Sequence, residues 1–160
     1  MSRVALLIGG NTGNRELLID QATEQIRQRI GSVVALSKVY ETEPWGSFGD
    51  DCPQNFLNRA LLVETELSPQ EALREALAIE AALGRTRKAS MTSSDRLYHS
   101  RPMDIDLIFF DDLVMDTPEL TLPHPRMHLR SFVLEPLAEI MPDYRHPVLG
   151  KTVRELLKML

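Results

Sequence analysis

The chain has 160 residues, a usual length for one domain, and 43% of them are hydrophobic and 26% charged. Eighteen Lys and Arg against 23 Asp and Glu give a formal net charge of −5, which argues against a general nucleic-acid or membrane-surface binder. Near the start the longest apolar run is residues 4–8, too short for a membrane span or a signal peptide, and the single cysteine, Cys52, excludes an intrachain disulfide. We therefore expect one domain over residues 1–160, located in the reducing cytoplasm.

The chain begins with a predicted strand and a predicted helix. Residues 4–8 are all apolar and are followed by Gly9–Gly10, as in a short buried strand that ends at a glycine turn. Residues 15–30 predict a helix that Asn14 caps and Gly31 ends. The expected buried stripe of this helix consists of Leu18, Ala22, Ile26 and Ile30.

Two further strands are predicted on either side of a long loop. Residues 33–40 alternate and are rich in β-branched side chains, which predicts one continuous strand. Residues 41–54 contain two Pro and two Gly, and a loop longer than about 12 residues in a compact domain tends to be functional. Residues 55–67 predict the third strand. One face of it is expected to carry Leu57, Leu61, Val63 and Leu67, and the other Asn58, Ala60, Leu62 and Glu64.

The second half of the chain predicts a helix, a strand and a helical tail. Ser68, Pro69 and Glu71 form a helix start with a capping box, and this helix stops at Gly84. Residues 103–110 predict the fourth strand. The tail has a helical stretch near residues 130–140. It ends in a helix capped by Thr152 and Glu155 with an apolar stripe of Val153, Leu156, Leu157 and Leu160.

The order strand, helix, strand, strand, helix, strand indicates the α+β class. It is typical of a ferredoxin-like βαββαβ sandwich, in which both helices cover one face of an antiparallel four-stranded sheet. The tail adds a C-terminal helical extension to this predicted fold.

The most informative side chains are Asp104 and Asp106, at the start of a strand that is otherwise apolar. Residues two apart on a strand point to the same side, with their Cα atoms roughly 6.5–7 Å apart. Ile105 and Leu107 then face the core, and the two carboxylates face the other way. Two close carboxylates repel each other unless a cation lies between them, and Mg²⁺ is bound in proteins by one or two such groups. The alternative is a pair of solvated aspartates at a frayed strand end.

A basic segment precedes this pair. Residues 84–101 carry Arg85, Arg87, Lys88, Arg96 and Arg101 against one Asp, for a local charge of +4. Cations next to a metal-binding carboxylate pair indicate a polyphosphate ligand, because the Arg and Lys side chains neutralise the oxygens that the metal does not cover. A solvated basic loop is the other interpretation. Because the segment has no apolar period, we expect it to be mobile and to order over bound phosphates.

Other motifs are weaker or absent. The turn at residues 9–14 is glycine-rich but lacks the Lys-Ser/Thr of a P-loop. His124 lies between two prolines, so it is either structural or placed to contact a phosphate or ribose. We expect His99 and His146 to lie at the surface, and Cys52 to have no catalytic role because no His stands near it in sequence.

Taken together, these residues and motifs resemble those of the 6-hydroxymethyl-7,8-dihydropterin pyrophosphokinase family along nearly the whole chain. The most specific segments are Arg-Pro-Met-Asp-Ile-Asp-Leu, at residues 101–107, and Leu-Pro-His-Pro-Arg, at residues 122–126. Weaker matches are Ile-Gly-Gly-Asn at residues 8–11, Tyr-Glu-Thr-Glu-Pro-Trp-Gly at residues 40–46 and Phe-Leu-Asn at residues 56–58. All of them occur in the order that the family has.

The resemblance implies transfer of pyrophosphate from ATP to the pterin hydroxymethyl oxygen, with release of AMP. It implies that two Mg²⁺ ions bind to Asp104 and Asp106, and that Asp106 assists deprotonation. The implied phosphate-handling cations are Arg85, Arg87, Lys88 and Arg101, joined by Arg130. His124 and Glu80 are implied nucleotide-site residues. The implied pterin pocket consists of Thr42, Pro44, Trp45, Phe56, Asn58 and Phe132.

Two functional hypotheses follow from the sequence. The first is this pyrophosphokinase, a single domain that acts on small molecules, with no nucleic-acid or membrane partner and as a monomer. The second is a binding module on the same sheet, either an RNA-recognition or a small-molecule regulatory domain. An RNA-recognition domain needs exposed aromatic residues on its third strand. Residues 58–62 contain none, and a regulatory domain has no need of Asp104 and Asp106 beside five cations.

Overall fold

The computed structural model describes residues 1–42, 55–84 and 103–160. Its main sheet has the strand order β2 (Ser32–Leu36), β4 (Phe56–Thr65), β1 (Ser2–Gly10) and β5 (Asp104–Phe110). All neighbouring strands are antiparallel, and the short β3 (Tyr40–Thr42) also pairs with β4. This topology confirms the predicted ferredoxin-like sandwich.

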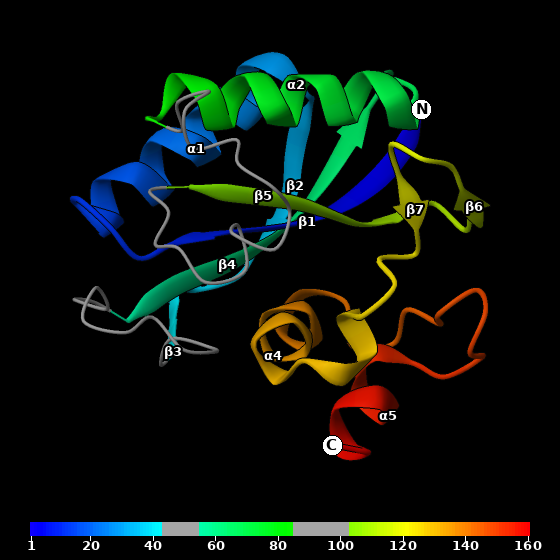
Figure 1. Ribbon diagram of the computed structural model, residues 1–160. Coiled ribbons are helices and arrows are strands. Elements are labelled where there is room, and N and C mark those ends of the chain that lie inside the picture. Colours follow the sequence, from blue (N-terminus) through cyan, green and yellow to red (C-terminus); the bar gives the residue numbers. More distant parts are fainter. Residues whose placement is uncertain (43–54, 85–102) are drawn as a thin grey trace.

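Helices cover both faces of the sheet (Figure 1). One face is covered by α1 (Arg15–Arg29) and α2 (Pro69–Ala82), as the βαββαβ order predicts. The other face is covered by the C-terminal extension, in which α4 (Ser131–Ile140) lies on the sheet and α5 (Val153–Lys158) packs against α4. A small hairpin of β6 (Met115–Asp116) and β7 (Thr121–Leu122) and the 3-10 turn η2 (Met127–Leu129) connect the two parts. No helix in the described part of the chain is long and apolar enough to cross a membrane.

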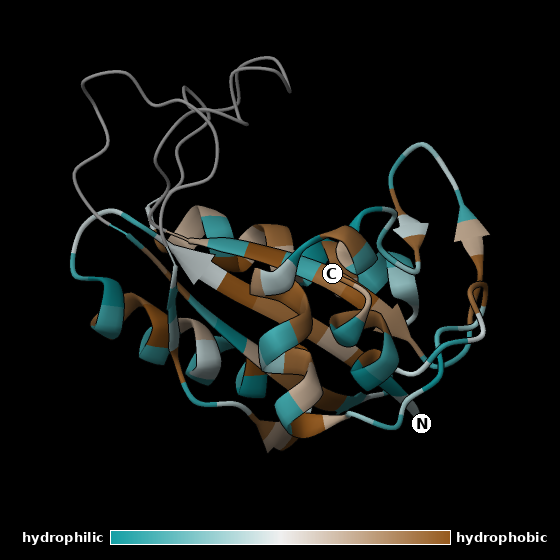
Figure 2. Cartoon of the chain, turned by 90° about the horizontal axis from the view of Figure 1, so that it is seen from below, coloured by the Kyte–Doolittle hydropathy of each residue, from teal (hydrophilic) through white to brown (hydrophobic). Residues whose placement is uncertain are grey.

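Alternation along the strands produces two apolar cores. In β1, Val4, Leu6 and Ile8 face α1 and α2, whereas Ala5 and Leu7 face α4. On β4, Ala60 and Leu62 face α4, so the second face of the sheet is covered here as well. Figure 2 shows the hydrophobic residues gathered along the strands between the helices. Burial on both sides explains why β1 reads as an unbroken apolar run.

The helix starts follow the predicted capping chemistry. The Asn14 side chain accepts a hydrogen bond from the Leu17 N–H. Complete capping boxes begin α2, at Ser68 and Glu71, and α5, at Thr152 and Glu155.

The stripe of α1 is wider than predicted, because Ile19 and Thr23 are buried while Leu18 is half-buried. In α5, Val153 and Leu156 are buried, but Leu160 is exposed beyond the helix end.

The predicted strand over residues 33–40 is wrong in one respect, because the structure divides it into β2 and β3. The division lies at Ser37, a buried residue whose backbone N–H donates to the Ala60 carbonyl. Its hydroxyl oxygen accepts a hydrogen bond from the Ala60 N–H. A serine that bonds both backbone groups of the neighbouring strand replaces the regular ladder locally. The chain therefore leaves the sheet edge and returns to it as β3.

The first strand continues past its predicted end. Gly9 and Gly10 belong to β1, where Gly9 pairs with Asn58 on β4 and with Asp104 on β5. A Cβ atom at Gly9 would lie 2.5 Å from Asn58 Oδ1 and 2.6 Å from the Leu57 carbonyl oxygen. The glycine is therefore required by close packing inside the sheet and not by a turn.

His146 is buried, with 5% of its surface exposed, which contradicts the predicted surface position. Its Nδ1 accepts hydrogen bonds from the backbone N–H groups of Val148 and Leu149, at 3.1 and 3.0 Å. Its ring stands edge-on to Phe109, whose centroid is 5.8 Å away. The histidine thus organises the turn before α5 as a neutral acceptor.

We predict that Gly9→Ala destabilises the protein by about 1–3 kcal/mol, the usual cost of forcing a methyl group into a packed site. Chemical denaturation followed by circular dichroism measures this change. Gly150→Ala is the matched control, since its φ of 70° strains an alanine but a Cβ there meets no atom within 4 Å. The control should lose only about 1 kcal/mol. Equal losses in the two variants would contradict a steric role for Gly9.

We also predict that His146 makes stability depend on pH. Burial, followed by the charge of His128, lowers the pKa of His146 in the folded protein. Below the ordinary histidine pKa of about 6.5 the unfolded chain therefore binds a proton that the folded chain refuses. The contribution of His146 to the free energy of unfolding is therefore complete above this pH and decreases as the pH falls. Between pH 8 and pH 5 the denaturation midpoint should decrease less for His146→Ala than for the wild type. An identical dependence of the midpoint on pH in the two proteins would contradict the prediction.

Candidate active site

The sheet brings distant polar residues into one row across its α4 face. Tyr40 pairs with Asn58, Asn58 pairs with Gly9, and Gly9 pairs with Asp104. Residues that pair directly across antiparallel strands project to the same face. Because Gly9 has no side chain, the Asn58 amide can lie close over the strand there, with its Oδ1 only 2.5 Å from the position a Cβ atom would take. The two residues are separated by two strand spacings, or roughly 9–10 Å.

Asp104 and Asp106 lie as predicted on one face of β5. Both are half-buried, while Ile105 and Leu107 are buried against the opposite core. Asp106 pairs with Leu7 in the row next to the Gly9 row. The two carboxylates therefore lie side by side at the edge of the apolar cluster between the sheet and α4.

His124 and Arg130 join this carboxylate pair. Burial and the charges of Arg130 and Arg126 together lower the pKa of His124 to about 4, although the charge of Asp104 opposes them. The imidazole is therefore neutral at physiological pH. Its Nδ1 accepts a hydrogen bond from the Arg126 N–H at 3.3 Å, which assigns its hydrogen to Nε2. His124 is thus a neutral donor, and Arg130 is a cation beside it.

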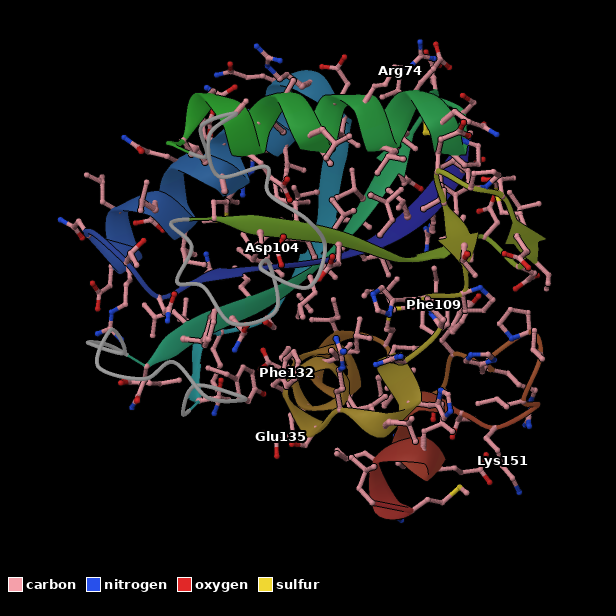
Figure 3. The ribbon with its side chains drawn as sticks, viewed as in Figure 1. Arg74, Asp104, Phe109, Phe132, Glu135 and Lys151 are labelled. Carbon is pink, nitrogen blue, oxygen red and sulfur yellow. The ribbon has the colours of Figure 1, made fainter. Side chains whose placement is uncertain are left out.

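A second group of predicted residues lies at the β3 end of the same face. The Asn58 side chain is buried, and its amide donates to Thr42 Oγ1 at 3.0 Å. Phe56 is paired with Thr42 across β3 and β4. Phe132, at the start of α4, lies below the sheet in Figure 3, and the Arg130 guanidinium is 5.7 Å from its ring centroid. An amide, a hydroxyl and two aromatic rings thus come from three separate elements.

Glu80 reaches the site region from the opposite side of the sheet. It is 3% exposed on α2, and its Oε2 accepts a hydrogen bond from the Ile105 N–H at 2.7 Å. Ile105 stands between the two aspartates, so this bond fixes the edge of β5 at the carboxylate pair. Sequence reasoning did not find this backbone contact, because nothing local relates Glu80 to a residue 25 positions later.

A cavity of about 670 Å³ also escaped the sequence analysis. It lies beside the outer edge of β5, and its walls come from α2, β5 and the turn before β7. Leu73, Leu77 and Ile105 supply apolar surface, while Asp104 and Asp106 border the cavity. Leu77 is 49% exposed and Leu73 is half-buried, so α2 presents apolar surface to this cavity. The sequence carries no signal for the cavity, because two leucines at helical spacing are equally typical of a core stripe.

Several predicted residues lie outside the described residues. These are Pro44, Trp45, Arg85, Arg87, Lys88 and Arg101, together with His99, Cys52 and the proposed closing segment. The described residues alone therefore show two carboxylates, a neutral imidazole donor, a cation and an amide-aromatic pocket on one sheet face. In these described ranges, no group of three or more His, Cys, Asp or Glu is arranged to hold a metal ion. A cation at Asp104 and Asp106 would thus need further ligands from substrate or water.

Comparison with characterised sequences connects this arrangement with one enzyme family. Residues 5–142 match the family model of 7,8-dihydro-6-hydroxymethylpterin-pyrophosphokinase. A 2-amino-4-hydroxy-6-hydroxymethyldihydropteridine pyrophosphokinase of Porphyromonas gingivalis is 42% identical over 92% of this chain and 95% of its own length. The enzyme of the same name from Methylorubrum extorquens is 40% identical over 100% of this chain and 94% of its own length.

Solved structures support the same fold. The crystal structure of wild-type Plasmodium falciparum HPPK-DHPS superposes with a TM-score of 0.74 at 17% identity, covering 99% of this chain. Our chain spans only 44% of the length of that protein, so the structural likeness concerns the fold of that part alone. With the family model and the sequence relatives, it follows that the chain belongs to the 7,8-dihydro-6-hydroxymethylpterin-pyrophosphokinase family.

Proposed function

We propose that the chain transfers pyrophosphate from ATP to the hydroxymethyl group of 6-hydroxymethyl-7,8-dihydropterin and releases AMP, in folate biosynthesis. Membership of the pyrophosphokinase family supports this activity. The structural observation that carries it is the row Asn58–Gly9–Asp104. This row unites a pocket for a planar polar ring with a carboxylate pair for a polyphosphate. A binding module has no need of the carboxylate pair, so the enzyme is the better interpretation.

The pterin ring fits the end of the face near β3. A flat heterocycle binds well between aromatic faces with a few oriented polar partners at its edge. Phe56 and Phe132 would supply the aromatic faces, and Asn58 and Thr42 the hydrogen bonds. Gly9 would allow the Asn58 amide to lie close to the sheet, because a side chain at Gly9 would collide with it. From the sequence, Pro44 and Trp45 are assigned to the same pocket.

The nucleotide fits the other end. The cavity beside β5 offers apolar walls from Leu73 and Leu77 and opens next to both aspartates. A base seated there would bring its phosphates towards Asp104, His124 and Arg130. Glu80 lines the same cavity, which supports its assignment to the nucleotide site. Arg85, Arg87, Lys88 and Arg101 are assigned to the phosphates from the sequence alone.

The donor set at Asp104 and Asp106 fits Mg²⁺. This ion is bound by one or two carboxylates and completes its octahedron with water and phosphate oxygens. Two half-buried carboxylates on alternate residues of β5 provide such a set. When bound, Mg²⁺ would neutralise the triphosphate charge and orient it, and we assign two ions to the pair.

In the reaction, the pterin hydroxymethyl oxygen forms a bond to the β-phosphorus of ATP, and the bond from this phosphorus to the oxygen of AMP breaks. The chain's own residues hold the two substrates in line, and positioning supplies most of the rate. Nε2–H of neutral His124 donates to a phosphate oxygen, and Arg130 offsets the charge that develops on the departing oxygen. The hydroxyl proton is lost to solvent, and Asp106 is the residue assigned to assist this deprotonation.

We further propose that the chain works as a monomer in the cytoplasm, as one domain over residues 1–160. Both substrates are small molecules, which a single domain of this size can bind. The direct test of the function is AMP release from ATP with Mg²⁺ and the hydroxymethyl-dihydropterin. AMP formation that requires the pterin would support the proposal, and no AMP above background would overturn it.

We predict that Asp104→Asn and Asp106→Asn each lower kcat more than tenfold, a barrier increase above about 1.4 kcal/mol, while the melting temperature stays near that of the wild type. The reason is that amides do not bind Mg²⁺ as carboxylates do. Asp20→Asn, on the exposed face of α1, is the matched control and should keep full activity. Retention of more than about a tenth of kcat by either site variant would contradict the metal assignment.

We predict that Asn58→Ala weakens pterin binding by about 1–3 kcal/mol, because a buried polar partner is lost. ATP affinity, measured by calorimetry with a non-hydrolysable analogue, should barely change. Gln28→Ala is the control: its side chain donates to Glu24 on the exposed face of α1, away from the site. Equal losses for both ligands in Asn58→Ala would indicate a damaged β4 in place of a lost pterin contact.

A further inference from the structure

The short strand β3 carries a critical part of the proposed pterin pocket. It has three residues and pairs with β4 through Tyr40, Glu41 and Thr42. Thr42 receives the hydrogen bond of the buried Asn58 amide. Isolated short strands are marginally stable, so a three-residue strand at a sheet edge needs support beyond its own ladder.

That support comes from helix α4 on the α4 face of the sheet. The two oxygens of Glu139 are both used: Oε1 accepts from the Tyr40 hydroxyl at 2.7 Å, and Oε2 accepts from the Lys38 backbone N–H at 3.0 Å. One carboxylate therefore binds the residues on both sides of Val39, at the point where the chain re-enters the sheet. Bonds to an ionised acceptor are stronger than bonds between neutral groups.

The electrostatic surroundings agree with a lasting contact. Burial, the hydrogen bond to Glu139 and the charges of Glu139 and Glu135 raise the pKa of Tyr40 to about 12. The hydroxyl therefore keeps its hydrogen, and remains a donor, at any pH at which the enzyme would be assayed. The Lys38 ammonium lies 5.0 Å from the Tyr40 ring centroid and covers the ring with a positive charge.

The same helix carries another part of the pocket. Phe132 lies in the first turn of α4, and Glu139 lies near its last residue. A helix of ten residues moves as one body, so holding β3 through Glu139 also fixes the distance from Thr42 and Asn58 to Phe132. Both hydrogen bonds of Glu139 in the described part of the chain go to residues on the β3 side of the face, Tyr40 and Lys38. An effect of Glu139 should thus be confined to the pterin side.

We propose that Glu139 is a positioning residue for the pterin: by holding Tyr40 and Lys38, it fixes β3 and thereby sets Thr42, Asn58 and Phe132 at the spacing that the ring requires. This inference deepens the proposed function and rests on it. Glu139 touches no reacting atom, and its effect is transmitted through Tyr40.

Steady-state kinetics with both substrates varied separate this role from a general structural one. In Glu139→Ala, the KM for the hydroxymethyl-dihydropterin should rise about threefold or more, while the KM for ATP and kcat change less than about twofold. Glu139→Gln keeps one acceptor oxygen and should restore part of the pterin KM. Tyr40→Phe should also raise the pterin KM, by a smaller factor than Glu139→Ala. It serves as the second variant if Glu139→Ala folds poorly.

Glu135→Gln is the matched control. Glu135 lies one turn earlier on the exposed side of α4 (Figure 3). Its charge acts on Tyr40, but no hydrogen bond links it to β3 in the described residues. The control removes the same charge without breaking the contact, so its pterin KM should equal that of the wild type. A double variant Tyr40→Phe/Glu139→Ala should be no worse than Glu139→Ala alone, because both changes break one connection.

The outcomes separate the inference from the function on which it rests. A wild-type enzyme without pterin-dependent AMP release would overturn the proposed function itself. An active wild type, with Glu139→Ala indistinguishable from Glu135→Gln or raising the KM of both substrates equally, would overturn only the positioning role. Amide hydrogen exchange gives a readout independent of activity: the Thr42 amide should exchange faster in Glu139→Ala than in Glu135→Gln, and equal rates would also count against the role.

Discussion

The placement of β1 between β4 and β5 is the constraint on which the rest of the structure depends. It sets Asn58 and Asp104 on either side of Gly9, although 46 positions separate them in the chain. Any side chain at Gly9 would collide with Asn58 and with the Leu57 backbone, so the register and the position of the Asn58 amide both require a glycine here. The carboxylate pair, the Asn58 amide and the contact between α4 and β3 are all arranged around this row.

Local patterns in the sequence were sufficient for most of the elements and for the placement of the two aspartates on one face of β5. Hydrogen bonds between residues three apart make the capping boxes at Ser68 and Thr152 readable without a structure. The alternation of Asp104 and Asp106 with buried neighbours likewise follows from strand geometry alone. The charge of Asp104 acts on His124 in the structure, but only the resemblance to a known family assigned both residues to one site beforehand.

What the sequence could not reveal depends on contacts between distant segments. Ser37 divides a strand because it bonds Ala60, and Glu80 fixes β5 because it reaches Ile105. His146 is buried because Phe109 covers it, whereas its own neighbours in sequence are polar or proline-rich. The cavity beside β5 arises between α2 and the sheet edge, and no periodicity within either element records the space left between them.

Under the proposed function, the pairing of Asn58 and Asp104 through Gly9 also limits which acceptors can react. The separation of the two residues is two strand spacings, fixed by backbone hydrogen bonds that side-chain movement cannot alter. An alcohol with one more methylene between ring and oxygen would still occupy the proposed pocket, but its oxygen would not meet the β-phosphorus in line. Selection would then appear in the rate of transfer and not in the affinity, because the ring would be held at Asn58 and the phosphates at Asp104.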